Sequence, residues 1–272
     1  MNNIILVRGA GDLASAVIHK LHMCGFKVVA LEIEKPLAIR RQVTFCEAIY
    51  EGEVEIEGVS CKLCNSISQV KETLNINKVA LYVDPKGESI KEINPKVVVD
   101  CILAKKNIGT SKDMADLTIG LGPGFCAGED VDIVIETMRG HNLGRVIRKG
   151  KPKENTGIPG EINGVSKDRV VYSQASGIIN TLCNIGDIVK KDQVLAYIED
   201  NSGNKHKVLA SIDGLLRGII RDGSFVKSNL KILDIDPRLD QVKNASTISD
   251  KGRNIAGGVL EAILSSKILP KY

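Results

Sequence analysis

The chain has 272 residues, of which 43% are hydrophobic and 26% are charged, and these proportions exclude disordered and collagen-like classes. Aromatic residues make up 3% and Trp is absent, which argues against a stacking surface for single-stranded nucleic acid. The net charge is +4 and forms no long block of one sign, so we expect no nucleic-acid partner.

The cellular location follows from what the sequence lacks. The first residues, Met1-Asn2-Asn3-Ile4, have no basic region or apolar core of a signal peptide, and no run approaches the roughly 18 apolar residues of a membrane span. Seven cysteines without a secretory signal indicate free thiols in a reducing compartment. We therefore expect a soluble, cytoplasmic protein with no membrane partner, and a homo-oligomer is left open.

The first predicted element is a short buried strand, Ile4–Arg8, which ends at Gly9. A helical pattern follows through Leu13, Val17, Ile18 and Leu21 and closes at Gly25, and a second strand follows at Lys27–Ile33. Strand, tight turn, helix and strand within about 30 residues predict a βαβ unit.

The sequence to about residue 145 continues to alternate buried strands with helices or turns. Helix starts are predicted at Thr44–Glu47, which has the spacing of a capping box, and at Thr110–Asp113. Further strands are predicted at Val79–Val83, Val97–Ile102, Leu117–Gly120 and Ile133–Ile135. This alternation predicts a Rossmann-like, mostly parallel sheet.

Glycine and proline then interrupt the pattern at Gly150–Lys153 and at residues 156–160, so we predict domains of residues 1–148 and 149–272. An internal repeat follows with an offset of 37 residues: Gly177, Gly186, Val189 and Ile198 recur as Gly214, Gly223, Val226 and Ile235. Two such halves predict a small lipoyl- or biotinyl-like β-barrel, a barrel-sandwich hybrid.

A last helix is predicted from Thr247–Asp250, with an apolar stripe of Ile255, Val259, Leu260, Ile263 and Leu264. Gly257-Gly258 within it indicates close approach to a neighbouring backbone. The predicted fold class is therefore α/β: the Rossmann-like sheet, the barrel and a C-terminal helix.

The turn after the first strand has the spacing of a dinucleotide-binding fingerprint. Gly9 permits the tight turn, Gly11 lets backbone N–H groups approach a pyrophosphate, and Ala14 keeps the helix close to the sheet. Glu32 stands where an acid would hold a ribose hydroxyl. The turn therefore predicts a ligand at a helix N-terminus, although a loop without a ligand is the alternative and the carboxylate of Asp12 would repel phosphate. The predicted cofactor-binding residues of this turn are Gly9, Gly11, Asp12, Leu13, Ala14 and Glu32.

Three further groups could line the same site. Arg40 and Arg41 could contact a phosphate or form a solvated helix face, and Lys105-Lys106-Asn107 could contact a ligand at a strand end or form an exposed basic turn. A second glycine-rich loop could form another wall or be a structural turn. Its predicted site residues are Gly120, Gly122, Gly124 and Glu129, and Glu136, Arg139 and His141 follow closely.

The cysteines favour structural interpretations. Cys61 and Cys64 lack a second Cys or His pair, and Val59, Cys61 and Leu63 alternate as in a strand, so we predict no metal site. Cys101 and Cys126 flank the candidate ligand loops, where a thiolate could bind a soft metal or selenium species, but small buried side chains are the simpler interpretation.

A lipoyl or biotinyl carrier bears its cofactor on a Lys at the hairpin between the two halves. That hairpin is Glu199–Asn204 here, and Lys205 comes too late in the turn by the usual spacing. A carrier role is therefore disfavoured, and the predicted barrel is structural or a docking module.

Seven segments read together as one longer pattern: residues 7–14, 36–41, 104–110, 120–131, 136–144, 155–162 and 234–238. Over nearly the whole chain they resemble the accessory proteins of selenium-dependent molybdenum hydroxylase systems (the YqeB type). The resemblance implies a role in maturing a molybdenum hydroxylase that carries a labile selenium, with that hydroxylase as partner. It implies no catalytic residues.

The leading hypothesis is an accessory factor that binds a nucleotide, such as NAD(P), or a molybdenum-pterin dinucleotide in the Rossmann-like crevice. Arg40, Arg41, Lys105 and Lys106 would neutralise phosphates, and Glu129 or Cys126 would act near the metal–chalcogen centre. One alternative is an NAD(P)-dependent oxidoreductase on a small substrate, although no Tyr-Lys or His-Asp pair stands beside the turn. A non-enzymatic nucleotide-binding scaffold is the other.

Overall fold

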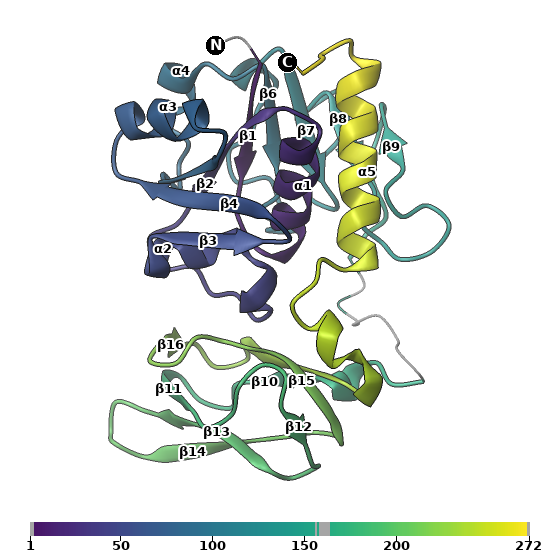
Figure 1. The fold of residues 1–272 in the computed structure, drawn as a ribbon. Coiled ribbons are helices and arrows are strands. Elements are labelled where there is room, and N and C mark those ends of the chain that lie inside the picture. The colour runs from purple at the N-terminus through teal and green to yellow at the C-terminus, as the bar shows by residue number, and fades with distance from the viewer. Residues whose placement is uncertain (1–2, 156, 158–163, 271–272) are drawn as a thin grey trace. The chain divides into compact units, whose positions relative to one another are not determined.

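The computed structural model describes residues 3–155, 157 and 164–270, and these form two compact units. The first unit comprises Met1–Pro36, Thr44–Asn155 and Ile248–Tyr272, and the second comprises Leu37–Val43 and Thr156–Thr247 (Figure 1). The units differ from the predicted domains, residues 1–148 and 149–272, because the last helix packs in the first unit and a short early segment packs in the second. Of the predicted linker at 156–160, residues 156 and 158–160 lie outside the described part of the chain.

A nine-stranded mixed sheet forms the centre of the first unit, in the order β3-β4-β5-β2-β1-β6-β7-β8-β9. The inner strands from β4 to β8 are parallel, whereas β3 and β9 pair antiparallel at the two edges. The strands are β1 (Ile4–Arg8), β2 (Lys27–Glu32), β3 (Glu53–Ile56), β4 (Val59–Cys64), β5 (Val79–Val83), β6 (Val97–Asp100), β7 (Leu117–Leu121), β8 (Ile133–Ile135) and β9 (Val146–Ile147).

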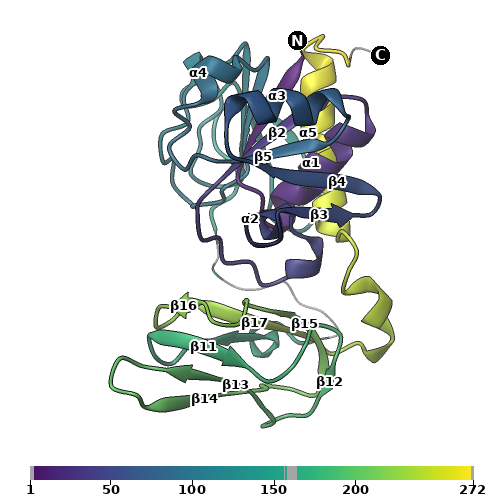
Figure 2. The same cartoon turned by 60° about the vertical axis from the view of Figure 1, so that its left-hand side comes forward.

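The α-helices of the described residues all belong to the first unit: α1 (Asp12–Met23), α2 (Ala48–Glu51), α3 (Ile67–Asn75), α4 (Ile90–Ile93) and α5 (Asp250–Ser265). Short 3-10 helices lie at Arg41–Val43, Phe45–Glu47, Lys112–Met114, Lys167–Arg169 and Leu239–Asn244. The first and last long helices, α1 and α5, lie side by side in both views of the molecule (Figures 1 and 2). None of the helices in the described part of the chain is both long and apolar enough to cross a lipid bilayer.

The βαβ unit at the N-terminus is confirmed, because β1 and β2 are parallel neighbours joined by α1. Their fully buried apolar residues explain this placement, since strands covered on both faces consist of near-continuous hydrophobic runs. Ile4, Leu6 and Val29 pack on one face with apolar side chains of α3 and α4.

The predicted helix starts have a mixed outcome. Thr44 precedes a 3-10 turn and the four-residue α2, but its side chain makes no capping hydrogen bond. The segment after Thr110 forms only the 3-10 turn Lys112–Met114. The last helix begins as predicted, with the Ser249 hydroxyl accepting a hydrogen bond from the Gly252 N–H at 3.0 Å.

Two four-stranded antiparallel sheets form the second unit, in the orders β10-β17-β15-β12 and β14-β13-β11-β16. One core cluster lies between their inward-facing residues and includes Ile179, Leu195 and Ile235. The strands are β10 (Val170–Tyr172), β11 (Gly177–Thr181), β12 (Ile188–Val189), β13 (Val194–Glu199), β14 (Lys205–Leu209), β15 (Gly214–Ile219), β16 (Phe225–Val226) and β17 (Lys231–Asp236).

The 37-residue repeat is visible in the strand pairing. Strands β11, β12 and β13 recur 37 residues later as β15, β16 and β17. Shifted by the same 37 residues, β10 coincides with the C-terminal part of β14. Gly177 pairs with Val226, and its counterpart Gly214 pairs with Val189. The same pairing is therefore made twice, each time between a strand of one copy and a strand of the other.

The predicted fold class, a Rossmann-like mostly parallel sheet followed by a lipoyl-type barrel, is wrong. The first unit has a nine-stranded mixed sheet with antiparallel strands at both edges, and in the described residues no α-helix connects β6 to β7 or β7 to β8. The second unit has two separate sheets, and among the described strands β10 and β14 each pair with one neighbour. Local patterns predict strands and turns, but sheet closure depends on pairings between distant segments.

Candidate functional site

The carboxyl ends of the central parallel strands carry most of the predicted site residues. The glycine turn follows β1, Glu32 ends β2, Lys105-Lys106-Asn107 follows β6, and the second glycine-rich loop follows β7. These four strands occupy neighbouring positions in the sheet, in the order β2-β1-β6-β7. Ligands of open α/β sheets bind at this edge, and the structure brings these loops together there.

Gly9 is required by the backbone geometry of its turn. Its φ angle is +94°, a conformation that favours glycine, and its N–H donates to the Leu31 carbonyl at 2.7 Å. A Cβ atom at this position would lie 3.3 Å from the carbonyl carbon of Cys101. Gly9 therefore allows the turn after β1 to pack closely against the loop after β6.

Gly11 differs from Gly9 because, among the residues that the structure describes, none fills the space beside it. It is the N-cap residue of α1 and supplies no capping side chain of its own. A Cβ atom here would meet nothing within 4 Å, whereas α3 and α5 are capped by the hydroxyls of Ser66 and Ser249. The first N–H groups of a helix favour an anion, so this end of α1 has the room and the polarity for one.

The first residues of α1 contribute in different ways. Ala14 is buried at 1% exposure and is followed by the buried Ser15, whose hydroxyl donates to the Ala10 carbonyl at 3.0 Å. Asp12 and Leu13 are half-buried in the first turn. The small side chain of Ala14 thus faces the protein, and Asp12 adds a negative charge beside the helix end.

Glu32 takes part in the glycine turn itself. One carboxylate oxygen accepts the Ala10 N–H and the other accepts the Ile33 N–H, both at 2.8 Å. Burial raises the pKa of this carboxyl, and the hydrogen bonds from Ile33 and Ala10 oppose that shift. A ribose hydroxyl would have to compete with these two bonds, so the geometry disfavours the ribose-binding role predicted for Glu32.

A buried polar network beneath the turn was missed by the sequence analysis. The Arg8 guanidinium is 2% exposed, donates to the Thr110 hydroxyl at 2.5 Å and lies 3.7 Å from the Asp100 carboxylate. The Thr110 hydroxyl in turn donates to Asp100 at 2.6 Å. An arginine within the apolar run of β1 was the available signal, because such a charge is buried only with a partner.

Asn107 shapes the loop that bears the two predicted lysines. Its side-chain oxygen accepts the Gly109 and Thr110 N–H groups at 2.9 and 2.8 Å, and its amide donates to the Thr110 carbonyl at 2.7 Å. These bonds hold Thr110 toward the buried network. Lys105 and Lys106 are exposed on the same loop, where their charges can reach a ligand in solvent.

The second glycine-rich loop packs against its neighbours at every predicted glycine. Cβ atoms would lie 2.5 Å from the Phe125 ring at Gly120, 2.4 Å from the Thr137 hydroxyl at Gly122, and 2.7 Å from the Lys106 nitrogen at Gly124. The loop is therefore adjacent to the lysine loop, as expected for a second wall. Its glycines serve packing, and Glu129 is exposed farther along the loop.

A second charged group surrounds the first turn of α5. Arg139 pairs with Asp250 at 3.1 Å, and Lys251 follows on the helix. Burial and the Arg139 charge lower the pKa of Lys251, while Asp12, Glu136 and Asp250 oppose that shift. Lys251 therefore lies near the start of α1 as well as α5, and a lysine with a lowered pKa near a glycine turn is a candidate site residue.

Two residues that follow β8, Glu136 and His141, differ in burial. Glu136 is buried and accepts the Met138 and Lys153 N–H groups at 2.8 Å, so its carboxylate is structural. His141 is exposed.

Arg40 and Arg41 belong to the second unit. Arg40 is 6% exposed and donates to the Thr247 carbonyl at 2.8 Å, and Arg41 donates to the Ile219 carbonyl at 2.9 Å. The solvated helix face considered for these residues does not describe Arg40. These contacts lie within the second unit, so the phosphate-binding role of both arginines stays a prediction.

The four cysteines singled out in the sequence, Cys61, Cys64, Cys101 and Cys126, are buried. Burial, with a smaller effect of Asp100, raises the pKa of Cys101 well above its ordinary value. Burial and the neighbouring Glu129 raise the pKa of Cys126. Cys61 and Cys64 lie on β4 as predicted, and among the described residues no group of three or more His, Cys, Asp or Glu side chains could hold a metal ion.

Comparisons with known proteins give one strong similarity. No family model matches the chain. Over 97% of its length it is 44% identical to the uncharacterized protein YqeB of Escherichia coli strain K12. The chain spans about half of that protein, 48% of its length.

Similarities to solved structures are weak. An aspartoacylase family protein from Mesorhizobium loti aligns with 86% of this chain and 84% of its own at 11% identity and a TM-score of 0.26. The product-bound ectoine utilization protein EutE (DoeB) from Ruegeria pomeroyi aligns with 86% of this chain and 57% of its own at 11% identity and a TM-score of 0.25. These scores are too low to relate the folds, whereas the identity to YqeB supports the predicted relationship to the YqeB type.

Proposed function

We propose that the first unit binds a phosphate-bearing ligand, a nucleotide or the dinucleotide form of a molybdenum pterin, at the carboxyl edge of its sheet. The N-terminus of α1 at Gly11 carries this proposal, because it combines open space beside the glycine N-cap with a helix end that favours anions. Lys105, Lys106, Arg139 and Lys251 are the cations that can balance the ligand's charge around it.

We further propose that the protein is an accessory factor in the maturation of a selenium-dependent molybdenum hydroxylase, which would be its partner. The similarity to YqeB supports the family relationship on which this role rests. The N-terminus of α1 would hold the phosphates of such a cofactor, which would supply the metal–chalcogen chemistry when bound. The chain's own contribution is to bind and orient it.

The binding proposal is tested by calorimetry with inorganic pyrophosphate, ADP, NAD, NADP and purified molybdenum-pterin dinucleotide. A bulky side chain in Gly11→Leu would occupy the unfilled space beside α1, so we expect at least about tenfold weaker binding with an unchanged circular dichroism spectrum. Lys251→Met should also weaken binding, because it removes one cation.

Gly257→Leu is the matched control, because a Cβ atom at this exposed position of α5 also meets nothing within 4 Å. Equal affinity of the Gly11→Leu variant and the unchanged protein would refute the site, as would binding of none of the five ligands. The maturation role is tested separately: unchanged selenium in the hydroxylase of a deletion strain would refute it.

A further inference from the structure

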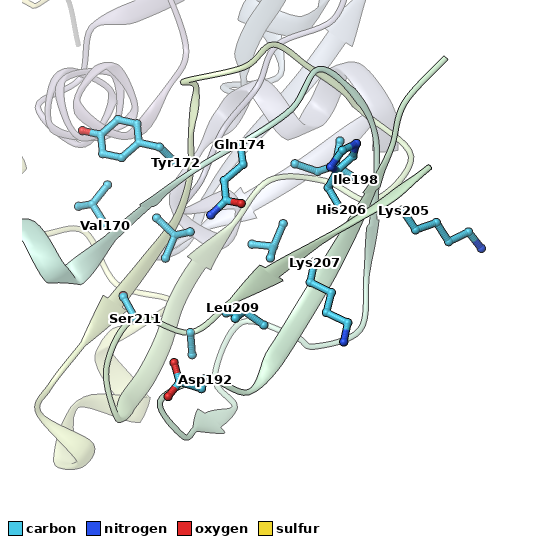
Figure 3. A pocket seen from close by; sticks show the side chains of 13 residues that line it. Val170, Tyr172, Gln174, Asp192, Ile198, Lys205, His206, Lys207, Leu209 and Ser211 are labelled. Carbon is cyan, nitrogen blue, oxygen red and sulfur yellow. The ribbon is translucent and has the colours of Figure 1, made fainter. Parts of the chain in front are cut away.

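The second unit contains a pocket of about 680 Å³ that none of the predicted site residues line. Two edge strands, β10 and β14, contribute most of its wall, and Figure 3 shows their side chains around it. Each of these strands is the last one of its sheet. The pocket therefore lies where two sheets end in strands that, within the described part of the chain, have one unpaired side.

The backbone of β14 shows which groups face that unpaired side. Asn204 accepts the Asp200 N–H at 3.0 Å, and Ala210 donates to the Gln193 carbonyl at 2.9 Å, so the even-numbered residues bond toward β13. Bonding direction alternates along an antiparallel strand. The N–H and C=O groups of Lys205, Lys207 and Leu209 consequently point away from β13.

The opposite wall is formed by β10, the outer strand of the other sheet. Ser173 exchanges hydrogen bonds with Leu230 and Asn229 at 2.8 Å, so Ser173 bonds toward β17, although the register of β10 against β17 shifts between Val171 and Tyr172. Val170 is also the 37-residue counterpart of Lys207 in the repeat. The β14 edge thus offers a regular row of backbone donors and acceptors to an added strand, whereas the pairing of β10 is irregular.

Charge distinguishes the β14 edge. Lys205 and Lys207 are exposed, and their side chains extend to the same side of the strand in Figure 3. Lys205 lies 4.0 Å from Glu199, while Lys207 has no ion pair within the described residues. Leu209, 39% exposed, follows on the same face.

These features discriminate between partners. Lysines on an edge strand discourage pairing with a second copy of the same edge, since like charges would lie opposite one another. A strand with acidic residues at alternate positions would instead place each carboxylate opposite a lysine.

We propose that the β14 edge binds an extended acidic segment of a partner protein by strand addition. The segment adds a fifth strand to the sheet of β14, with acidic side chains opposite Lys205 and Lys207 and an apolar one near Leu209. Five residues match the length of β14, about 17 Å at the usual rise per residue. This docking is independent of the ligand proposed for the first unit.

The test uses the full chain and a blocked heptapeptide of alternating Glu and Val, followed by NMR. We expect slower hydrogen exchange at the amides of Lys205, Lys207 and Leu209, because these become hydrogen-bonded. The double variant Lys205→Glu/Lys207→Glu should bind this peptide at least about tenfold more weakly and should gain affinity for a Lys-Val peptide of the same pattern.

Lys227→Glu makes the same kind of charge change just after β16, the opposite edge of the same sheet, and should leave binding unchanged. Equal binding of the Glu-Val and Lys-Val peptides to the unchanged protein would overturn the proposal. Unchanged hydrogen exchange at the β14 amides in the presence of the peptide would also overturn it. Slower exchange that appears when the protein concentration is raised without peptide would overturn it too, because a second copy of the chain would then be the occupant.

Discussion

At the scale of single residues, two adjacent glycines of α5 show how differently neighbouring positions are constrained. A Cβ atom at Gly258 would lie 2.1 Å from the Gly144 carbonyl oxygen, whereas one at Gly257 would meet nothing within 4 Å. The predicted close approach of a backbone is confirmed at Gly258 alone. Sequence indicates that a glycine pair breaks the helical pattern, but only the packed partner shows which member needs to be glycine.

Gly258→Ala should lower the free energy of unfolding by about 1 to 3 kcal/mol, because the added methyl group forces α5 away from the Gly144 loop. Gly257→Ala, the control, should raise it by about 0.5 to 1 kcal/mol, since alanine is the better helix former at an exposed site. Urea denaturation of both variants measures these changes. Equal effects of the two substitutions would contradict the packing described.

The Arg8–Asp100–Thr110 network illustrates what periodicity cannot predict. The apolar run of Ile4–Arg8 predicts β1 correctly, and Arg8 is buried with it. Its partners lie about 100 residues away on β6 and on the loop that follows. Such a pairing depends on β1 and β6 being neighbours, which no local pattern encodes.

At the scale of elements, the turn after β5 is organised by one carboxylate. Asp84 accepts the Gly87, Glu88 and Ser89 N–H groups and the Ser89 hydroxyl, and the turn also places the Pro85 carbonyl 3.4 Å from Arg8. Burial alone would raise the pKa of Asp84, but the bonds from Ser89, Glu88 and Gly87 hold it below its ordinary value.

Asp84→Asn should destabilise the protein by about 1 to 3 kcal/mol at pH 7, because an amide cannot accept all four bonds. The carboxylate contributes stability above its unfolded pKa and loses it as pH falls through the lower folded pKa. The difference between variant and unchanged protein should therefore shrink below about pH 4. Denaturant unfolding across pH measures it.

Asp116→Asn is the matched control, because that carboxylate is exposed and forms a surface ion pair with Lys96. Its effect should stay below about 1 kcal/mol at every pH. A pH-independent loss in Asp84→Asn would show that the lowered pKa does not contribute to stability.

Elements of the sheet were predicted well where burial is continuous. Val79–Val83 and Ile133–Ile135 form the strands predicted for them, since a short apolar run bounded by turns is typical of a buried strand. The antiparallel edge strand β3 was missed because it has only four residues, Glu53–Ile56, and no continuous apolar run, although its charged and apolar residues alternate as in a half-buried strand. Site residues on glycine turns were recognisable, whereas Lys251 follows a helix start that carries no chemical signature of its own.

At the scale of the whole molecule, the chain passes between the two units more than once. Residues 37–43 lie between segments of the first unit but belong to the second. Ile39 packs against the core of the second unit, and a Cβ atom at Gly218 would lie 2.7 Å from it. A boundary placed at one glycine-rich stretch could not describe this, because domain membership follows packing and not chain order.

Ile39→Ala should therefore destabilise the second unit selectively, by about 1 to 3 kcal/mol. Hydrogen exchange followed by mass spectrometry should show faster exchange in β15 and β17 and no change in β1 and β2. Ile33→Ala, at an exposed position of the first unit, should change neither. Faster exchange confined to β1 and β2 would contradict the assignment of residues 37–43 to the second unit.

The repeat has a consequence for how the second unit assembles. Each copy of four strands, β10–β13 and β14–β17, pairs its first strand with the last strand of the other copy. Its second and third strands also pair across copies. A chain with one copy could complete these pairings only with another molecule, so the duplicated sequence achieves within one polypeptide what a two-fold symmetric dimer of half-length chains would achieve with two.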